Sequence, residues 1–425
     1  MHVIVIGAGI VGVCTAYWLN RHGMQVTVLD RRSGIAQEAS FGSAGLAAAD
    51  HAAPWACPGM PRHLASYMFK AEQPAMLRPA MDPRHWGWLR AWLRQCQAER
   101  YAGNLGAMQR LARYSRTCFA ELQERHGFEY ERRNGTVQLL RSQRDVERSK
   151  PARQLMQEHG IPHQLLTPEQ AIALDPHLRD ASRVGTPLAG AIYYPGDDSG
   201  NCPLYARLLA AECERNGVVF RFNAMARPTQ DIRGAVAGVQ LHDGQALAAQ
   251  AVVMANGSDA TAMLVKLGVR APLLSITGHA ATVPLRDDAI GPRRAFIDQA
   301  YGVSFTPLGH RLRIASTTDL GGRRPGTHDK ARRTLARAAR DWLPGVLDFS
   351  RATWWSGACA TTPDGPPILG RTRLPGLYLN IGHGAHGWGM APGAGRIVAD
   401  AVAGREPGEP LDGLDIARYA RKNRG

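Results

Sequence analysis

Long apolar stretches are absent from this chain of 425 residues, in which no run reaches 18 apolar side chains. A transmembrane helix needs about 20 such residues, so none is predicted. The opening run, MHVIVIGAG, is too short for the apolar part of a signal peptide and has no basic flank, so we interpret it as a buried strand. These absences favour a cytoplasmic protein.

Cysteine pairs and metal-ligand spacings are also missing. The seven cysteines lie at positions 14, 57, 96, 118, 202, 213 and 359, and none forms a CxxC motif. An odd number of scattered thiols is typical of a reducing compartment. No set of cysteines and histidines has the spacing of zinc ligands. We therefore expect free thiols and no metal site.

Basic residues are in excess but do not form blocks. The formal net charge is +15, carried mostly by arginines spread along the chain. Such a balance is compatible with nucleic acid, an anionic membrane surface or an acidic substrate as partner, and also with a merely arginine-rich surface. Nucleic-acid binding usually needs a clustered basic stripe. Because none is present, no nucleic-acid partner is expected.

The strongest motif lies at the N-terminus. The apolar run HVIVI leads into Gly7-Ala8-Gly9-Ile10-Val11-Gly12, a helical pattern follows, and a second apolar run ends at Asp30. In this strand–GxGxxG–helix–strand–acid unit, Gly7 permits a tight turn, Gly9 admits a pyrophosphate and Gly12 lets helix and strand pack closely. The acid accepts hydrogen bonds from a ribose. The motif predicts an adenine dinucleotide without choosing between FAD and NAD.

The rest of the chain predicts an α/β fold, with a Rossmann-type nucleotide lobe and an inserted, mostly antiparallel α+β substrate lobe. A second buried strand, AQAVVMANG at 249–257, precedes a helix, and several strands are expected between 271 and 318. We assign 1–60, 195–270 and 355–425 to the nucleotide lobe, and 61–194 and 271–354 to the substrate lobe.

Two local patterns carry further expectations. Asn134-Gly135, inside FEYERRNGTVQLLRS, predicts a hairpin turn. Trp86, Trp88 and Trp92 alternate with arginines in a helical pattern. This helix is either an amphipathic core helix or a patch that touches a membrane interface.

Several stretches together carry a family resemblance that runs nearly end to end. They are HAAPWACPGMP (51–61), RLARYSR (110–116), DDSGNCPLYARLLA (197–210), RFN (221–223), TPDGPPILGRTR (362–373), NIGHGAHGWGMAPGAG (380–395) and DGLDIARYAR (412–421). With these motifs the chain resembles the FAD-dependent D-amino-acid dehydrogenases, within the wider family of glycine oxidase and D-amino-acid oxidase.

The resemblance implies a cofactor, a reaction and a partner. The cofactor is FAD, and the substrate is a small amine or amino acid whose Cα–H passes as hydride to the flavin N5, giving an imine that water hydrolyses. Electrons pass to a quinone, with peripheral association at the inner membrane. The residues expected at the cofactor are Gly7, Gly9, Gly12, Asp30, Arg31, Ser40, Ser43, Ala44, Gly45, Ala255, Gly257, Gly382, His383, Gly384, Gly387, Trp388 and Gly389.

The chain departs from the family at its substrate clamp. The family's arginine, in a Gly-Leu-Arg-Pro run before the TPDG-like turn, is replaced by Cys359 in Gly357-Ala358-Cys359-Ala360. This change removes a bidentate partner for a carboxylate, whose burial without one is costly. Cys359 is either a small wall residue, the lining of a pocket enlarged for a bulkier or cyclic amine, or a covalent link to the flavin.

Other candidates for the substrate end follow from the same comparison. If the substrate has a carboxylate, the cations that could replace the arginine are Arg313, His279, His383 and His386, and Tyr301 could orient the amine. His279 stands where the family usually has tyrosine, and His386 where it usually has an apolar residue. The alternative function is a flavin oxidase or oxygenase that acts with O₂ on an amine without a carboxylate or on a biosynthetic intermediate.

Overall fold

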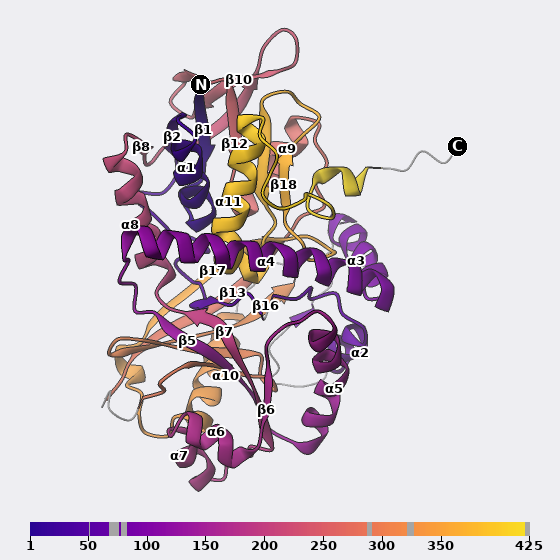
Figure 1. Cartoon of the computed structure of the whole chain (residues 1–425), viewed down its shortest axis with the longest axis vertical. Coiled ribbons are helices and arrows are strands. Elements are labelled where there is room, and N and C mark those ends of the chain that lie inside the picture. Colours follow the sequence, from indigo (N-terminus) through magenta and orange to yellow (C-terminus); the bar gives the residue numbers. More distant parts are fainter. Residues whose placement is uncertain (51, 68–75, 78–82, 287–290, 321–326, 421–425) are drawn as a thin grey trace.

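The chain folds into two lobes, each built around its own sheet (Figure 1). The computed structural model describes the chain apart from residues 51, 68–75, 78–82, 287–290, 321–326 and 421–425. Both ends of the described chain lie in the upper lobe of Figure 1. The long helix α4 (Ala98–His126) crosses between the two lobes.

The upper lobe, called here the nucleotide lobe, contains a six-stranded sheet in the order β18-β19-β12-β1-β2-β8. Its central strands pair in parallel, and only β18 runs antiparallel to its neighbour. The strand bounds are β1 (His2–Ile6), β2 (Gln25–Leu29), β8 (Val219–Arg221), β12 (Ala251–Met254), β18 (Ile368–Arg371) and β19 (Leu377–Ile381). Helices cover one face, and on the other Ile4, Val252 and Met254 pack against a small three-stranded sheet and helix α9 (Ala260–Lys266). Both faces are therefore buried, which explains the unbroken apolar runs of β1 and β12.

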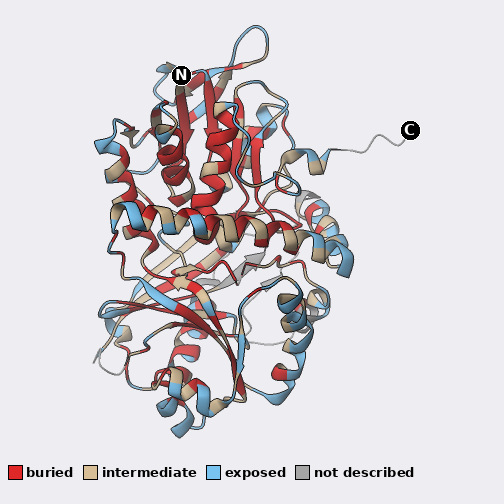
Figure 2. Cartoon of the chain, viewed as in Figure 1, coloured by how far each residue is buried: buried red, intermediate tan, exposed pale blue. Residues whose placement is uncertain are grey.

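Helices α1 (Ile10–Arg21), α8 (Cys202–Arg215) and α11 (Gly387–Ala403) pack with α4 into one core of this lobe. Figure 2 shows α1 and α11 as largely buried along their length. The two helices approach closely, since a Cβ on Gly395 would lie 2.8 Å from the carbonyl carbon of Cys14. Within the described residues, no helix is both long and apolar enough to cross a membrane.

The lower lobe contains a ten-stranded, mostly antiparallel sheet whose main path is β17-β13-β16-β15-β14-β5-β7-β3, with β4 beside β16 and β6 beside β7. Helix α10 (Thr327–Trp342) packs on one face of it. The bounds are β3 (Leu46–Ala47), β4 (Met76–Leu77), β5 (Arg133–Leu140), β6 (Gln164–Leu166), β7 (Gly190–Ser199), β13 (Leu274–Pro284), β14 (Ala295–Asp298), β15 (Val303–Leu308), β16 (Arg311–Leu320) and β17 (Thr353–Thr361).

The remaining elements are smaller. A three-stranded sheet consists of β9 (Ala226–Gln230), β10 (Val236–Leu241) and β11 (Ala246–Ala248). The other α-helices are α2 (Met60–Tyr67), α3 (Pro83–Gln95), α5 (Gln143–Glu158), α6 (Pro168–Leu174), α7 (Leu178–Arg183) and α9 (Ala260–Lys266). Short 3₁₀ turns lie at Gly257–Asp259, Phe349–Arg351, Gly384–His386 and Ile416–Tyr419.

The predicted α/β class and the two kinds of sheet are confirmed, but the expected hairpin at Asn134-Gly135 is wrong. Both residues lie inside β5, where a bulge shifts the register against β7 between Asn134 and Thr136. Gly135 has a φ of +78°, and a Cβ there would lie 2.6 Å from the ring of Tyr193. The glycine therefore serves a bulge and a close contact across strands instead of a turn.

Three segments join the lobes differently from a simple division by residue range. Strand β17 belongs to the ten-stranded sheet, β3 pairs with β7 in that same sheet, and α4 contributes Met108, Leu111 and Leu122 to the core of the nucleotide lobe. Each of these segments is anchored in one lobe and reaches the other. Strand β17 contacts the 3₁₀ turns at Gly257–Asp259 and Gly384–His386, and β3 contacts α11, so strands of the large sheet reach the nucleotide lobe directly.

A buried pair of acids lies where β7 meets the chain after β3. Asp197 is 0% exposed and Asp50 is 4% exposed. Asp197 accepts hydrogen bonds from the Asp50 amide (2.8 Å) and the Thr136 hydroxyl (2.9 Å), while Arg116 donates to Asp50 at 3.3 Å. Burial, and then the neighbouring Asp50, raise the pKa of Asp197 from 3.8 to about 7. This carboxyl therefore titrates near neutrality.

We expect the free energy of unfolding to fall as the pH rises from about 4 to about 7, because of Asp197. A carboxyl with a raised pKa holds its proton more tightly in the folded chain, so its stabilising effect is full below about pH 4 and is lost by about pH 7. In Asp197→Asn the amide stays neutral, and the Thr136 hydroxyl can turn to accept from it. The variant should melt at least about 2 °C higher than the wild type at pH 8.

Thermal melting followed by circular dichroism between about pH 5 and 8 tests this expectation. Asp198→Asn is the matched control, because that side chain pairs with Arg132 at 2.7 Å and is 24% exposed. An Asp197→Asn variant whose melting temperature falls with pH as steeply as that of the wild type contradicts the assignment.

Candidate functional site

The site begins at the N-terminus of α1. Gly7 has a φ of +111°, and a Cβ there would lie 2.6 Å from the Ala255 carbonyl oxygen. A Cβ on Gly12 would lie 1.8 Å from the Gly7 carbonyl oxygen, which leaves no room for a side chain. Gly9, in contrast, lines the pocket, and a Cβ there would meet only the Ser40 hydroxyl oxygen, at 3.2 Å. Its backbone is therefore open to a phosphate at the positive end of α1.

The acid at the end of β2 faces the same turn. Asp30 accepts hydrogen bonds from the Ala8 amide (2.6 Å) and the Arg32 amide (2.8 Å), so its carboxylate is fixed at the pocket wall. Beside it, Arg31 pairs with Glu38 (2.6 Å) and with Asp259 (2.8 Å). These contacts bring together the end of β2, the next loop and the 3₁₀ turn after β12. They form the end of the pocket that suits the ribose of an adenine nucleotide.

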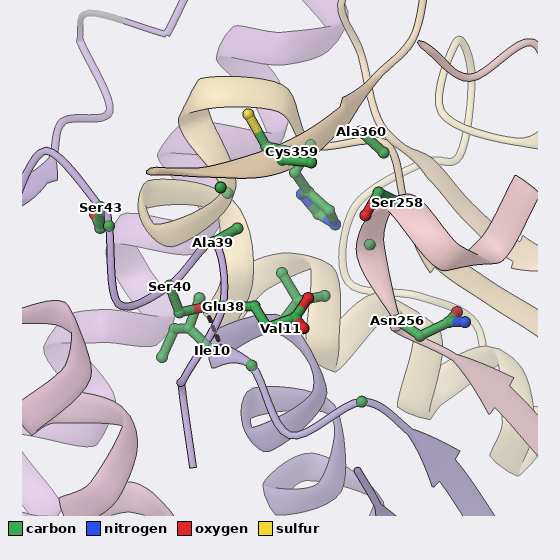
Figure 3. A pocket seen from close by; sticks show the side chains of 18 of the residues that line it. Ile10, Val11, Glu38, Ala39, Ser40, Ser43, Asn256, Ser258, Cys359 and Ala360 are labelled. Atoms are coloured by element: carbon green, nitrogen blue, oxygen red, sulfur yellow. Dashed lines mark hydrogen bonds between the residues drawn. The ribbon is translucent and has the colours of Figure 1, made fainter. Parts of the chain in front are cut away.

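The loop after β2 closes one side of the pocket. The Ser40 hydroxyl accepts the Ile10 amide hydrogen at 3.0 Å, the bond drawn in Figure 3, and its own hydrogen is free for a phosphate oxygen. The other lobe holds the far end of this loop. Arg313 donates to the Phe41 carbonyl at 2.7 Å and Thr306 donates to the Ala44 carbonyl at 2.7 Å.

The opposite side comes from the glycine-rich turn between β19 and α11. Gly382 and Gly384 have positive φ angles of 82° and 55°, and both line the pocket with Gly387 and Trp388. The backbone of His383 forms a bridge with Thr361 at the end of β17. The turn therefore lies between α1 and the large sheet. Its helix, α11, directs its N-terminal amides toward the same pocket.

The large sheet supplies the last wall. The register between β13 and β17 pairs Ile276 with Cys359 and Gly278 with Gly357, which places these four residues on one face. Cys359 and Ala360 lie across the pocket from Ile10 and Val11 (Figure 3). The indole of Trp355 packs on Gly357 and on Gly42 of the loop after β2. A Cβ on Gly42 would lie 2.0 Å from the ring, and a Cβ on Gly357 would lie 2.2 Å from it.

Cys359 is a buried thiol at the edge of an aromatic cluster. Its sulfur lies 3.7 Å from the Ile276 carbonyl oxygen, and the side chain packs against a cluster that includes Trp55, Trp88 and Trp92. Burial raises the pKa of the thiol to about 11. The group is therefore neutral at physiological pH, and it offers a substrate no charge.

Most of the predicted site residues line one continuous pocket. They are Gly7, Gly9, Asp30, Arg31, Ser40, Ser43, Ala44, Ala255, Gly257, His279, Cys359, Gly382, His383, Gly384, Gly387 and Trp388. Gly12, Gly45 and Gly389 lie behind the wall, where each allows two backbone segments to approach closely. Three candidates for the substrate end are placed elsewhere: Tyr301, Arg313 and His386 do not line the pocket.

Each of these three side chains has an evident structural partner. The Tyr301 ring lies against the guanidinium of Arg141, whose carbon is 4.9 Å from the ring centre. Arg313 is bound to the 41–45 loop, and burial lowers its pKa to about 10. His386 hydrogen-bonds the backbone at Ala53, and burial lowers its pKa. In β13, His279 lies on the same face of the sheet as Ala281, which packs in the core beneath α10. This is the face opposite the one that carries Cys359.

Sequence reasoning missed several residues of this pocket. The most informative is Asn380, a buried polar residue in the apolar strand β19, which bonds His383 at 2.7 Å. A polar side chain at the end of a buried strand is a signal that could have been used. Glu38, Ile276, Gly278 and Trp355 also line the pocket. Nothing in their local sequence distinguishes them, because they are brought there by strand register and by the fold of a loop.

Comparison with known proteins assigns the family. The model of the DAO family, described as "FAD dependent oxidoreductase", matches residues 2–401. The chain belongs to the DAO family of FAD-dependent oxidoreductases. It is 38% identical over 421 residues to the D-amino acid dehydrogenase of Methylobacterium radiotolerans, covering 99% of this chain and 100% of that protein. The corresponding enzyme of Xanthobacter autotrophicus is 36% identical over 421 residues, covering 99% of each chain.

Solved structures of the same fold support the architecture. Glycine oxidase from Bacillus cereus superposes with a TM-score of 0.72 at 21% identity, covering 97% of this chain and 98% of that one. L-proline dehydrogenase from P. horikoshii gives a TM-score of 0.73 at 21% identity, covering 99% and 98%. At these identities the likeness concerns the fold.

The described residues fit FAD along the whole pocket. The open backbone at Gly9 and the N-terminus of α1 suit the pyrophosphate, and Asp30 suits the adenosine ribose. Among the lining residues, His383 has a buried Nδ1 atom without a hydrogen-bond partner in the described part of the chain, as expected of an atom that meets a ligand. The predicted cofactor, FAD, is thus confirmed by family and by fit.

Proposed function

We propose that this enzyme dehydrogenates the C–N bond of an amino-acid-like amine, such as a D-amino acid or a cyclic imino acid. The observation that carries the proposal is that the FAD pocket continues to a chamber under β13 and β17. There Ile276, Gly278, Gly357 and Cys359 form a wall of small and apolar residues. The relatives named D-amino acid dehydrogenase, which match over nearly the whole chain, support the substrate class.

FAD, when bound, accepts a hydride from carbon. The residues at the chamber would contribute shape and water exclusion. A Cβ on Gly278 would meet nothing within 4 Å, so the wall is open there and a substrate can approach the cofactor closely. Trp355, lying over Gly357, and Ile276 would keep bulk water from the reacting bond. Because the Cys359 thiol stays protonated, we assign it no role as a base or nucleophile.

The charge of the chamber bears on the substrate's carboxylate. Of the two arginines considered at the site, Arg31 pairs with Glu38 and Asp259, and Arg313 is bound to backbone carbonyls of the 41–45 loop. Neither is free to form a bidentate clamp in the described part of the chain. A carboxylate buried beside neutral Cys359 would lose hydration without an equivalent partner. We therefore propose that simple D-amino acids are poor substrates and that bulkier or cyclic amines are preferred.

A panel of amines tests the reaction. The holoenzyme, mixed anaerobically with D-alanine, D-proline, D-hydroxyproline, sarcosine and simple amines, should lose its flavin absorbance with at least one of them. The flavin should bleach more slowly with D-alanine than with the best of the other compounds. Absence of bleaching with every compound contradicts the proposed reaction, and rapid bleaching by D-alanine contradicts the argument from charge. Comparing O₂ consumption with quinone or dye reduction then identifies the electron acceptor.

Restoring the charge at position 359 provides a second test. In Cys359→Arg the long side chain can lie on the tryptophan cluster while its guanidinium pairs with a carboxylate. A hydrogen bond to a charged group contributes about 1.5–3 kcal/mol, so kcat/KM for D-alanine should rise about 10- to 100-fold. Cys359→Ala is the matched control and should give no increase. An equal change in both variants would show that size, and not charge, limits D-alanine.

An exposed face on α3 supports a membrane-bound acceptor. Trp86 is 54% and Leu93 is 46% exposed, and both lie on the same helical face as the exposed Arg90 and Arg94. Trp88 and Trp92, on the opposite face, are buried, so the helix is anchored through them. Basic residues beside exposed aromatic and aliphatic side chains suit an anionic lipid surface. We propose that this face docks on the membrane, where the enzyme passes its electrons to quinone.

Vesicle sedimentation tests the docking. The holoenzyme should bind vesicles that contain phosphatidylserine more tightly than neutral phosphatidylcholine vesicles, and less so at high salt. The double variant Trp86→Ala/Leu93→Ser should bind about 10-fold more weakly, since exposed apolar area is lost. Ile232→Ser is the matched control, because Ile232 is fully exposed in the turn between β9 and β10. Equal losses in both variants, or no preference for anionic lipid, contradict the proposal.

A further inference from the structure

His383 is a buried polar side chain with one unused ring atom. The residue is 7% exposed, and its Nε2 atom lies 2.7 Å from the Asn380 side-chain oxygen. Its Nδ1 atom is buried and has no hydrogen-bond partner among the residues that the structure describes. The residue lines the FAD pocket. A buried ring nitrogen without a partner is costly unless a ligand or water satisfies it.

The hydrogen bonds around His383 determine which nitrogen carries the proton. The Thr15 hydroxyl donates to the Val11 carbonyl oxygen at 2.8 Å, so it must accept the bond from the Asn380 amide nitrogen at 2.9 Å. This orients the Asn380 oxygen toward His383, and Nε2 must then be the donor. Nδ1 is therefore left with a lone pair, and its function is to accept a hydrogen bond.

The charge state of the ring limits what it can bind. Burial lowers the pKa of His383 to about 3, so the ring is neutral at physiological pH. A neutral ring that presents a lone pair repels phosphate and carboxylate oxygens, which are also acceptors. The partner of Nδ1 must be an O–H or N–H group. This excludes the earlier possibility that His383 replaces the missing arginine as a cation.

The position of His383 identifies that group. His383 is linked through Asn380 to Thr15 on α1, the helix whose N-terminus suits the pyrophosphate. The backbone of His383 bridges Thr361 at the end of β17, beside the substrate chamber. The ribityl chain of FAD must span this interval, and its hydroxyls are donors. We infer that Nδ1 of His383 accepts a hydrogen bond from one ribityl hydroxyl of FAD, with Asn380 and Thr15 as positioning residues.

The inference rests on FAD binding and not on the proposed substrate, so its test needs no amine. Kd is measured by quenching of flavin fluorescence on the apo chain, with FAD and with analogues that lack the 2′, 3′ or 4′ ribityl hydroxyl. A neutral hydrogen bond contributes about 0.5–1.5 kcal/mol, so His383→Leu should weaken FAD binding about 3- to 10-fold. For one of the three analogues, the same substitution should leave Kd unchanged.

A second variant keeps the test decisive. His383→Asn places an amide oxygen near the former Nδ1 and should recover most of the affinity for FAD. Should the leucine variant fail to fold, Thr15→Val serves in its place, because it removes the acceptor that orients Asn380 and should show the same selective pattern more weakly. Equal weakening of FAD and all three analogues, or no weakening of any, overturns the inference. If the Kd values follow the expected pattern but the wild-type holoenzyme oxidises no amine, the inference stands and only the proposed reaction is contradicted.

Discussion

The structure depends on one close approach at the N-terminus of α1. There the turn at Gly7 contacts Gly12 of the helix and the end of β12 at Ala255, with distances that exclude any Cβ. This contact fixes the first turn of α1 at the edge of the sheet. It also sets the position of the pyrophosphate and the direction of the Ser40 loop. The hydrogen bonds from Thr15 through Asn380 to His383 start from the same helix. An alanine at Gly12 would displace the turn and, with it, the whole cofactor pocket.

The second constraint joins the two lobes through the loop that covers the cofactor. Arg313 and Thr306 reach from the large sheet to the carbonyls of Phe41 and Ala44. The same loop bonds α1 through Ser40. The substrate wall and the phosphate site are therefore held at a fixed distance by one short segment. Arg313, which the sequence offers as a replacement for the missing arginine, therefore has a structural role.

The sequence allowed the nucleotide lobe to be predicted well, because GxGxxG and Asp30 act locally and at fixed spacing. The substrate end was harder. Tyr301 was chosen for its family-like position and Arg313 as a cation that could replace the missing arginine. The first lies against Arg141, and a distant loop binds the second. Asn134-Gly135 has the composition of a turn, but its partner strand comes from residues 190–199, so it became a bulge. In all three cases contacts between distant segments determined the structure, and such contacts cannot be predicted from local sequence patterns.

Two residues of the cofactor pocket, Cys359 and His383, share one property: each is buried and uncharged at physiological pH. Burial raises the thiol's pKa to about 11 and lowers that of the imidazole to about 3, so both groups stay neutral across the physiological pH range. A pocket lined in this way distinguishes ligands by hydrogen-bond direction and by shape. In the proposed function FAD supplies the redox chemistry and the wall at Cys359 selects the substrate. A change at that one residue would then alter the substrate while the hydrogen bonds from Thr15 through Asn380 to His383 stay intact.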